Sequence, residues 1–261
     1  EDCRRRYCGL NKTVVLTRLG DGLLKYETTF AVSDIHGEYE KFIELLQHWD
    51  PDSMNLIIMG DLIDRGNDSL KVVQKAMQLR QDYGEQVVVL KGNHEDMLMM
   101  FLQERDYGTG SWYFNNGGNK TYESFIEEAD TYFHSYEVKA HKMSLKTNEI
   151  EFIRDLPLFQ EFGNVLFVHA GINPFISDWK QGDVKDFLWT RGHWNHKNET
   201  NKHIVFGHTP TQFMHNSQTN NNVWISNCGT NIAIDGGAVF GGQLNGLVID
   251  NNGKILNTIS V

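Results

Sequence analysis

The stretch Leu56-Ile57-Ile58-Met59-Gly60-Asp61-Leu62-Ile63-Asp64-Arg65-Gly66 joins a short apolar run to a turn that carries two aspartates and an arginine. The apolar run predicts a buried strand, so the charged side chains are expected where that strand ends. Four other segments repeat the arrangement, and they are Ser33-Asp34-Ile35-His36-Gly37, Gly92-Asn93-His94-Glu95, Val168-His169-Ala170-Gly171 and Phe206-Gly207-His208-Thr209-Pro210. Oxygen and nitrogen ligands that recur at strand ends predict one shared site.

The N-terminal part of the chain alternates strand and helix patterns, which is typical of βαβ units. Residues 12–32 read as a hairpin around a Gly-Asp-Gly turn, and its second arm leads to Asp34 and His36. Beyond this hairpin the apolar periodicity predicts helices at 39–49, 69–83 and 95–105, with strands at 56–59 and 86–90.

The alternation stops at residues 106–162, where an acidic and aromatic segment with helical stretches predicts a cap-like insertion. A strand at 165–168 restores the core, and short strands joined by Asn and Gly turns follow at 204–206, 222–225, 231–234, 243–249 and 255–259. A parallel half followed by an antiparallel half predicts a four-layer α/β fold, with two packed mixed sheets flanked by helices. We expect a single domain over residues 1–261, because no linker divides the chain.

The net charge limits the kinds of partner that the protein can bind. The chain has 24 Lys and Arg against 34 Asp and Glu, a formal charge of −10, so its surface should repel nucleic acid and anionic membranes. An anionic substrate would therefore need local positive charge, which bound divalent cations and arginines could supply.

The cysteines and the apolar runs favour a cytoplasmic protein. Cys3, Cys8 and Cys228 are odd in number and lack CxxC spacing, which argues against a disulfide framework and a cysteine zinc site. No apolar run approaches the roughly 18–20 residues of a membrane helix. The start lacks the apolar core of a signal peptide. The sequence leaves the oligomeric state open.

The recurring donors suit a dinuclear metal site. Carboxylate, amide and imidazole groups without thiolate fit manganese, iron or zinc in a hydrolytic centre. Asp34 and His36 can reach one ion, Asp61 is placed to bridge two ions, and the second ion is left with Asn93, His169 and His208. Two cations lower the pKa of a trapped water toward neutrality, which gives a hydroxide for in-line attack on phosphorus.

Four further residues complete the predicted chemistry. His94 is the candidate acid for the leaving oxygen, provided that Asp64 orients its ring and keeps it protonated. Arg65 and Arg191 are assigned to the phosphate of the substrate, together with Asn93, because guanidinium groups bind phosphate oxygens in pairs.

The ordered motifs Asp-x-His-Gly, Gly-Asp-x-x-Asp-Arg-Gly and Gly-Asn-His-Glu resemble those of the PPP family of metallophosphatases. The resemblance runs from about Ser33 to Asp250. The tail from Ile234 to Gly242 is similar to the small bacterial and phage branch that contains the lambda phage protein phosphatase. It implies a calcineurin-like metallophosphoesterase fold, manganese, serine/threonine and often tyrosine dephosphorylation, and the same roles for the ligands, the dyad and the arginines. Gly236, where relatives often have threonine, and the long N-terminal hairpin depart from the pattern and bear on substrate preference.

Simpler interpretations exist for single residues. Asp34 and Asp61 taken alone suit helix N-caps or turns, Asn93 suits a turn, and Arg191 suits a surface ion pair. The segment from Trp112 to Asn119 is either an adaptable wall of the site or a packed cap loop. Five ordered motifs together outweigh the single-residue readings.

The sequence therefore predicts a phosphoric monoester hydrolase that acts on phosphoproteins or phosphopeptides, most simply a serine/threonine phosphatase. One alternative is a symmetrical diadenosine tetraphosphate hydrolase, which shares the metal motifs. The other is a catalytically silent metal-binding scaffold, and the presence of the acid–base residues counts against it.

Overall fold

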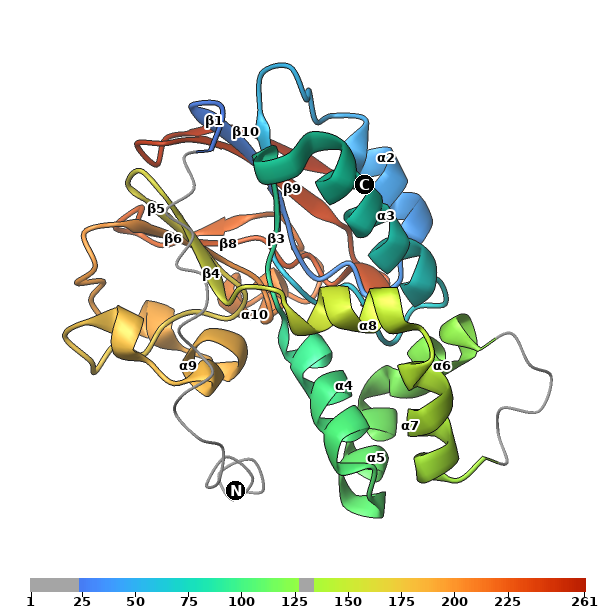
Figure 1. Ribbon diagram of the computed structural model, residues 1–261. Helices are drawn as coiled ribbons and strands as arrows, with labels where there is room; N and C mark the ends of the chain where they lie inside the picture. The colour runs from blue at the N-terminus through green and yellow to red at the C-terminus, as the bar shows by residue number, and fades with distance from the viewer. Residues whose placement is uncertain (1–23, 127–133) are drawn as a thin grey trace.

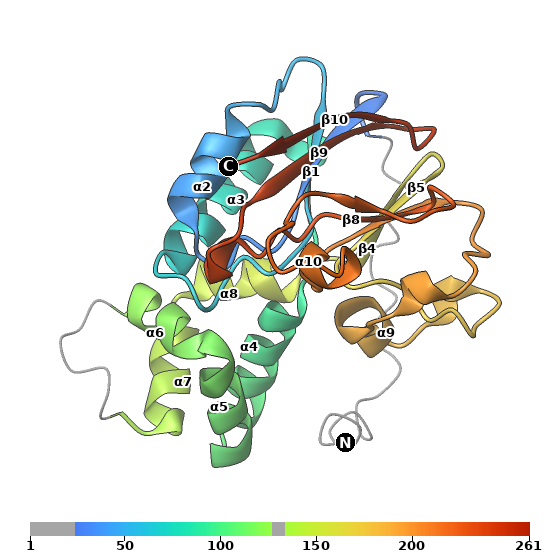
Figure 2. The same cartoon turned by 180° about the vertical axis from the view of Figure 1, so that it is seen from behind.

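The computed structural model describes residues 24–126 and 134–261, and Figures 1 and 2 show it from two sides. Its first sheet has the strand order β10-β9-β1-β2-β3. The strands are β1 (Thr28–Val32), β2 (Asn55–Ile58), β3 (Val87–Val89), β9 (Asn245–Asp250) and β10 (Ile255–Ser260). The first arm of the predicted hairpin lies outside the described residues. Its second arm contains β1, which pairs along both edges, with β2 and β9.

The second sheet has the order β4-β5-β6-β8-β7. Its strands are β4 (Phe159–Phe162), β5 (Val165–Val168), β6 (His203–Phe206), β7 (Trp224–Ile225) and β8 (Asn231–Ala233). The prediction of two mixed sheets is confirmed, but the division into a parallel and an antiparallel half is wrong. β5, β6 and β8 run parallel, and the C-terminal hairpin β9–β10 returns to the first sheet.

Alternate side chains of each central strand enter different cores, because successive residues of a strand point to opposite faces. In β1, Ala31 packs between the two sheets, whereas Phe30 belongs to the cluster that includes Phe42 of helix α2 (Tyr39–Leu46). In β5, Phe167 packs between the sheets, whereas Leu166 lies in the cluster beneath α9 (Val184–Trp189). The layers are helix, sheet, sheet and helix, as predicted (Figure 1).

Helix α3 (Ser69–Tyr83) has the predicted bounds and joins α2 on the outer face of the first sheet (Figure 2). Its buried residues Val72, Val73, Ala76 and Leu79 recur at helical spacing, which explains why this segment forms an amphipathic helix. α10 (Thr211–Met214) is a single turn after the strand end of β6, and one-turn helices lie at Gly84–Gln86, Trp179–Gln181, His193–Asn195 and Ala238–Phe240.

The expected cap is helical in the part that the structure describes. It contains α5 (Tyr107–Tyr113), a π-helical turn (Phe114–Gly118), α6 (Asn119–Phe125), α7 (Tyr136–Ser144) and α8 (Thr147–Arg154). These helices pack with α4 (Asn93–Glu104) below the first sheet, and the last residues of the predicted range form strand β4 instead (Figure 1). Within residues 24–126 and 134–261, no helix has the length and apolarity that a membrane crossing requires.

Candidate metal and phosphate site

The turns after the strands hold an unusual backbone. Nine described non-glycine residues have a positive φ, and six of them are predicted site residues: Asp34, His36, Asp61, Asp64, Arg65 and His208. A left-handed conformation costs a non-glycine residue on the order of 1–2 kcal/mol, and such residues cluster at functional sites. The fold therefore bends the chain sharply where β1, β2 and β6 end and turns these side chains toward one another.

Two glycines allow these turns to approach one another. A Cβ atom on Gly92 would overlap the Asp61 carboxylate, and a Cβ atom on Gly207 would overlap the Asp34 carboxylate. Only glycine leaves room for a carboxylate this close to the backbone. The motif glycines are thus explained by the packing of the site itself.

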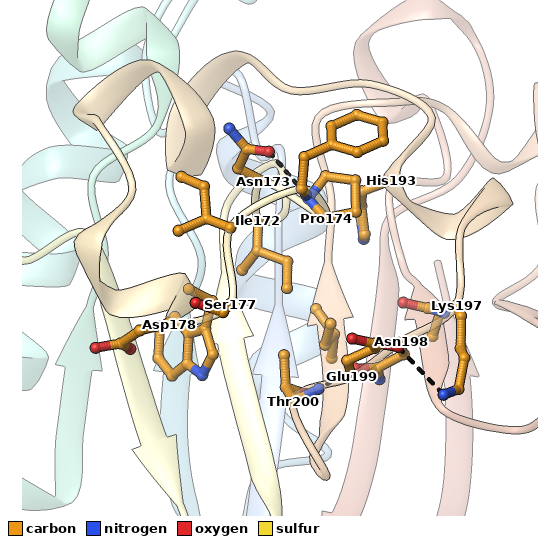
Figure 3. Close-up of a pocket in the computed structure, with 15 residues that line it drawn as sticks. Ile172, Asn173, Pro174, Ser177, Asp178, His193, Lys197, Asn198, Glu199 and Thr200 are labelled. Carbon is orange, nitrogen blue, oxygen red and sulfur yellow. Dashed lines mark hydrogen bonds and ion pairs between the residues drawn. The ribbon is translucent and has the colours of Figure 1, made fainter.

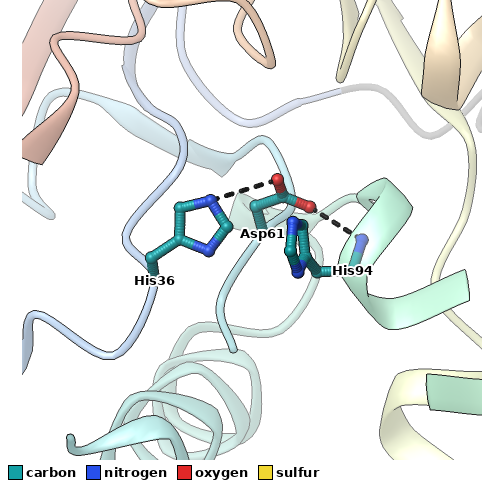
Figure 4. Close-up of side chains that lie close together, drawn as sticks. All are labelled: His36, Asp61 and His94. Atoms are coloured by element: carbon teal, nitrogen blue, oxygen red, sulfur yellow. Dashed lines mark hydrogen bonds and ion pairs between the residues drawn. The ribbon is translucent and has the colours of Figure 1, made fainter. Parts of the chain in front are cut away.

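Asp61 lies at the centre of the imidazoles (Figure 4). Its Oδ2 is 3.4 Å from His36 Nε2, and its Oδ1 is 3.5 Å from His169 Nε2. Among the described residues, two triplets bring possible ligand atoms within 4.8 Å of one another: His36, Asp61 and His94, and Asp61, His169 and His208. Asp61 is common to both triplets and offers a different oxygen to each side, which is the geometry that a bridging carboxylate needs.

Backbone carbonyls fix the orientation of two imidazoles. His36 Nδ1 lies 2.8 Å from the carbonyl oxygen of Ile63, and His169 Nδ1 lies 2.9 Å from that of Met59. A carbonyl oxygen only accepts hydrogen bonds, so each Nδ1 carries the proton and each Nε2 keeps a lone pair. This arrangement is typical of histidines that bind a metal through Nε2.

Two imidazoles converge on the side-chain oxygen of Asn93, and the contact from His169 joins two acceptors. His169 Nε2 is 3.0 Å from Asn93 Oδ1, and the same oxygen is 2.8 Å from His208 Nδ1. His208 Nε2 is buried and has no hydrogen-bond partner within residues 24–126 and 134–261. Burial raises the pKa of Asp61 well above its ordinary value, and the nearby Asp34 and Glu95 raise it further. Lone pairs and uncompensated negative charge at one place fit bound cations.

Asp34 lies beside this cluster and is almost fully buried. Its carboxylate accepts hydrogen bonds from the backbone N–H of His208, at 3.1 and 3.0 Å, and from Ser33 Oγ. The structure therefore brings the six predicted ligands around a common place: Asp34, His36, Asp61, Asn93, His169 and His208. His94 also lies within ligand distance of His36 and Asp61.

His94 and Asp64 form the expected pair. His94 Nδ1 is 2.7 Å from Asp64 Oδ2, and both side chains are buried. Burial raises the pKa of Asp64 to about 7, while burial and the nearby Arg65 and His169 hold the pKa of His94 well below its ordinary value. The loss of hydration disfavours both charges, which favours the neutral form of the hydrogen-bonded pair in the absence of bound ligand.

The two arginines and His94 line one pocket of about 190 Å³. Its walls are Asp61, Arg65, Asn93, His94, Asn116, Trp189, Arg191 and His208. Arg191 Nη1 donates to Thr209 Oγ1 at 2.7 Å, and Arg65 Nη1 points to His36 Nε2. Two guanidinium groups, a histidine and the metal-type donors thus face one space large enough for a phosphate.

Residues of the cap support this pocket, although no sequence pattern gives any one of them a role. The Tyr113 hydroxyl donates to Asp64 Oδ1 at 2.9 Å, and Thr121 Oγ1 donates to the same oxygen. The Arg65 backbone N–H donates to the carbonyl of Gly117 at 3.2 Å. Asn116 lines the pocket. The segment from Trp112 to Asn119 therefore contributes to the wall of the site and is packed as well.

Asp235 and Glu95 were also not predicted as site residues. Glu95 accepts hydrogen bonds from the backbone N–H groups of Asp61, Leu62 and Gly92, at 2.9, 2.8 and 2.7 Å. It thereby locks the Asp61 turn to the start of α4. Asp235 is buried, and burial together with Asp34 raises its pKa well above the ordinary value. Glu95 belongs to the Gly-Asn-His-Glu motif, and Asp235 lies in the tail segment from Ile234 to Gly242. The sequence offers no other signal for these two residues.

A larger pocket of about 490 Å³ lies elsewhere, between the Ile172–Trp179 loop and the 193–200 segment (Figure 3). It contains none of the predicted metal ligands. His193, which closes one end, is buried and touches Gly171, two residues from His169. Burial lowers its pKa to about 3, so the ring is neutral there.

Two packed mixed sheets, with clustered histidines and carboxylates at the ends of their strands, define a metallophosphoesterase. The model of the calcineurin-like phosphoesterase family matches residues 28–234, and the chain belongs to that family.

Curated relatives include both dinucleoside tetraphosphatases and protein phosphatases. The chain is 27% identical to the asymmetrical bis(5'-nucleosyl)-tetraphosphatase of Anoxybacillus flavithermus, over 83% of this chain and 88% of that one. It is 28% identical to serine/threonine-protein phosphatase 1 of Salmonella typhimurium, over 82% and 88%. A crystal structure titled as a putative diadenosine tetraphosphatase superposes with a TM-score of 0.62 at 18% identity, over 92% of this chain and 95% of that chain, which shows the shared fold.

Proposed function

We propose that this chain hydrolyses phosphate monoesters and that its substrates are phosphoserine and phosphothreonine proteins or peptides. One observation carries the proposal: Arg65, Arg191 and His94 line the same pocket as the metal-type donors Asp61 and Asn93. A monoester dianion needs this combination, because the arginines neutralise its oxygens while a nearby acid protonates its leaving group.

The residues that would hold the metal are Asp34, His36, Asp61, Asn93, His169 and His208, and we expect two divalent cations, most simply manganese with iron or zinc as alternatives. Bound cations would supply positive charge that polarises a water and the phosphate. Arg65 and Arg191 would then orient the phosphate from the protein side, with Asn93 beside them.

His94 has the proton-transfer role. Its Nδ1 is held by Asp64, so Nε2 is the atom that would deliver a proton to the leaving oxygen. A phosphate dianion in the pocket would favour the protonated ring, against the burial that lowers the pKa of His94 in the free protein. Asp64, held by Tyr113 and Thr121, keeps the ring in position.

A second candidate function is hydrolysis of dinucleoside tetraphosphates. The relative from Anoxybacillus flavithermus is named for the asymmetrical reaction, whereas the rival reading of the sequence was the symmetrical one. The phosphate pocket also continues into a second pocket of about 400 Å³, which is large enough for a nucleoside. A silent scaffold remains the third possibility, although the buried His94–Asp64 pair favours an enzyme.

The test is to measure kcat/KM with manganese for a phosphoserine peptide, p-nitrophenyl phosphate and diadenosine tetraphosphate. The highest value for the peptide supports the proposal, and the highest value for the dinucleotide supports the second candidate. Turnover of none of the three supports the scaffold. A His94→Asn protein purified in parallel controls for contaminating phosphatase. Metal analysis of protein isolated without added metal tests the manganese, and fractionation of the source cells tests the predicted cytoplasmic location.

A further inference from the structure

Two large aromatic side chains stand in solvent at the mouth of the site. Phe213 of α10 is 70% exposed, and Phe240 at the end of the Ala238–Phe240 turn is 65% exposed. Exposed aromatic rings lose hydrophobic stabilisation, and their presence at a catalytic mouth indicates a binding surface. Phe213 lies five positions after His208, and Phe240 lies five positions after Asp235, so the site turns themselves deliver both rings.

The backbone that carries the two rings is fixed. The Thr211 N–H donates to the carbonyl of Asp235 at 2.8 Å, which ties the start of α10 to the second segment. Lys41 Nζ donates to the carbonyl of Ala238 at 2.9 Å, which ties the second segment to α2. A ligand therefore does not have to order this backbone when it binds to the rings.

Both rings line the pocket of about 400 Å³ that adjoins the phosphate pocket. Arg65, Arg191 and His208 line both pockets, so a molecule whose phosphate is held by the arginines can extend directly to the aromatic rings. Pro210, Ala238 and Val239 supply further apolar wall. The smaller pocket, about 190 Å³, has room for little more than the phosphate itself.

Arg65 connects the two pockets electrostatically. The centre of its guanidinium group lies 5.2 Å from the centroid of the Phe240 ring, within the range of a cation–π contact. The charge that would hold the phosphate thus also helps to hold Phe240. Phe213 has no such contact with Arg65 among the described residues, so the two rings can be tested separately.

We propose that Phe213 and Phe240 form an aromatic subsite that binds a planar aromatic group of the substrate, next to the phosphate held by Arg65 and Arg191. This inference rests on the proposed phosphatase site and adds a preference to it. The shared chemistry is a flat π-system joined to a phosphate, and its source is either a nucleobase or the phenyl ring of a phosphotyrosine. Stacking of one base on a protein aromatic ring strengthens binding by about 5- to 150-fold.

Matched pairs of small phosphates measure the contribution of the ring. AMP and ribose 5-phosphate differ by the adenine, and phenyl phosphate and butyl phosphate differ by aromaticity. Their inhibition constants are measured with a phosphoserine peptide as the reporter substrate. We expect AMP, phenyl phosphate or both to bind at least about 5-fold more tightly than the non-aromatic partner. An effect of AMP alone identifies a nucleobase, and an effect of phenyl phosphate alone identifies phosphotyrosine.

The variants then assign the effect to the two rings. Phe213→Ala should lower the aromatic-to-non-aromatic ratio and leave the inhibition constants of ribose 5-phosphate and butyl phosphate unchanged, because these two molecules carry no aromatic group. Phe240→Ala should lower the same ratio and also weaken every phosphate, because Arg65 loses its ring contact. The matched control is Phe175→Ala, whose ring is 80% exposed in the other pocket and should change neither quantity.

Equal affinities within both pairs for the wild-type protein overturn the subsite, as does a ratio that Phe213→Ala and Phe240→Ala leave unchanged. If the peptide is not hydrolysed, the proposed function fails, and the subsite is then judged by direct titration of AMP against ribose 5-phosphate. Both rings are exposed, so thermal unfolding of the variants should match that of the wild type and exclude misfolding as the cause.

Discussion

Replacing His94 by asparagine separates the role of an acid from the role of a metal ligand. The structure permits both, since His94 is bonded to Asp64 at 2.7 Å and also lies in a triplet with His36 and Asp61. Its Nδ1 is hydrogen-bonded to Asp64, and His94 lines the phosphate pocket, so Nε2 is the ring nitrogen left for the substrate. We therefore expect His94→Asn to remove a proton donor and to leave the metal in place.

The expected loss is large but incomplete. A positioned general acid contributes about 10²- to 10⁴-fold to a rate, which is about 3–5 kcal/mol of the activation barrier. The loss should be greater for a phosphoserine peptide than for p-nitrophenyl phosphate, whose phenolate leaves without much help. The fold should persist, because Asp64 keeps its hydrogen bonds from Tyr113 and Thr121 and, with a pKa of about 7, can take up a proton.

The assay combines kcat for both substrates with metal content by elemental analysis. His141→Asn is the matched control, because His141 is exposed on α7, and it should behave like the wild type. Loss of one metal ion from the His94→Asn protein would refute the acid role and make His94 a ligand. An equal loss of rate for the two substrates would also contradict proton donation to the leaving group.

Three further predictions follow from the site. Asp61→Asn should deplete both metals, because its two oxygens face different imidazoles; elemental analysis that finds the wild-type metal content rejects the bridge. Arg191→Ala should raise the inhibition constant of inorganic phosphate by about 10- to 100-fold, because one charged hydrogen bond contributes that much to binding. An unchanged inhibition constant would show that Arg191 does not bind the phosphate. Burial raises the pKa of Asp64 from 3.8 to about 7, so the folded metal-free protein holds a proton that the unfolded chain releases. The stabilisation from this proton is complete below pH 3.8 and is lost as the pH rises to about 7. The loss is at most about 4 kcal/mol in the free energy of unfolding. Denaturant unfolding at several pH values should show a smaller decline for Asp64→Asn than for the wild type.

The strands and the ligand turns could be predicted because their signals are local. The run before Asp61 is continuous and apolar, and the predicted strand is displaced from β2 by one residue at each end. Helix α3 begins and ends where its apolar spacing indicates. Five motifs in a fixed order specify a site even when each residue alone is ambiguous.

Long-range pairing could not be predicted in the same way. β4 has no apolar run that distinguishes it from the cap, and it becomes a strand only because β5 is available beside it. Tyr113 and Thr121 meet Asp64 from 49 and 57 positions away, and no local pattern marks them. The return of β9 to the edge of β1 is likewise decided by which edges remain free.

The left-handed turns also bear on how this enzyme would respond to selection for heat resistance. Glycine at position 36, 61 or 208 would relax a strained backbone, so a screen that rewards thermal tolerance alone should enrich glycine at these positions. Each gain of that kind would remove a group from the metal and phosphate site. At these three positions thermal stability and catalytic activity therefore favour different residues. Thermostable variants of this chain should be engineered at other positions.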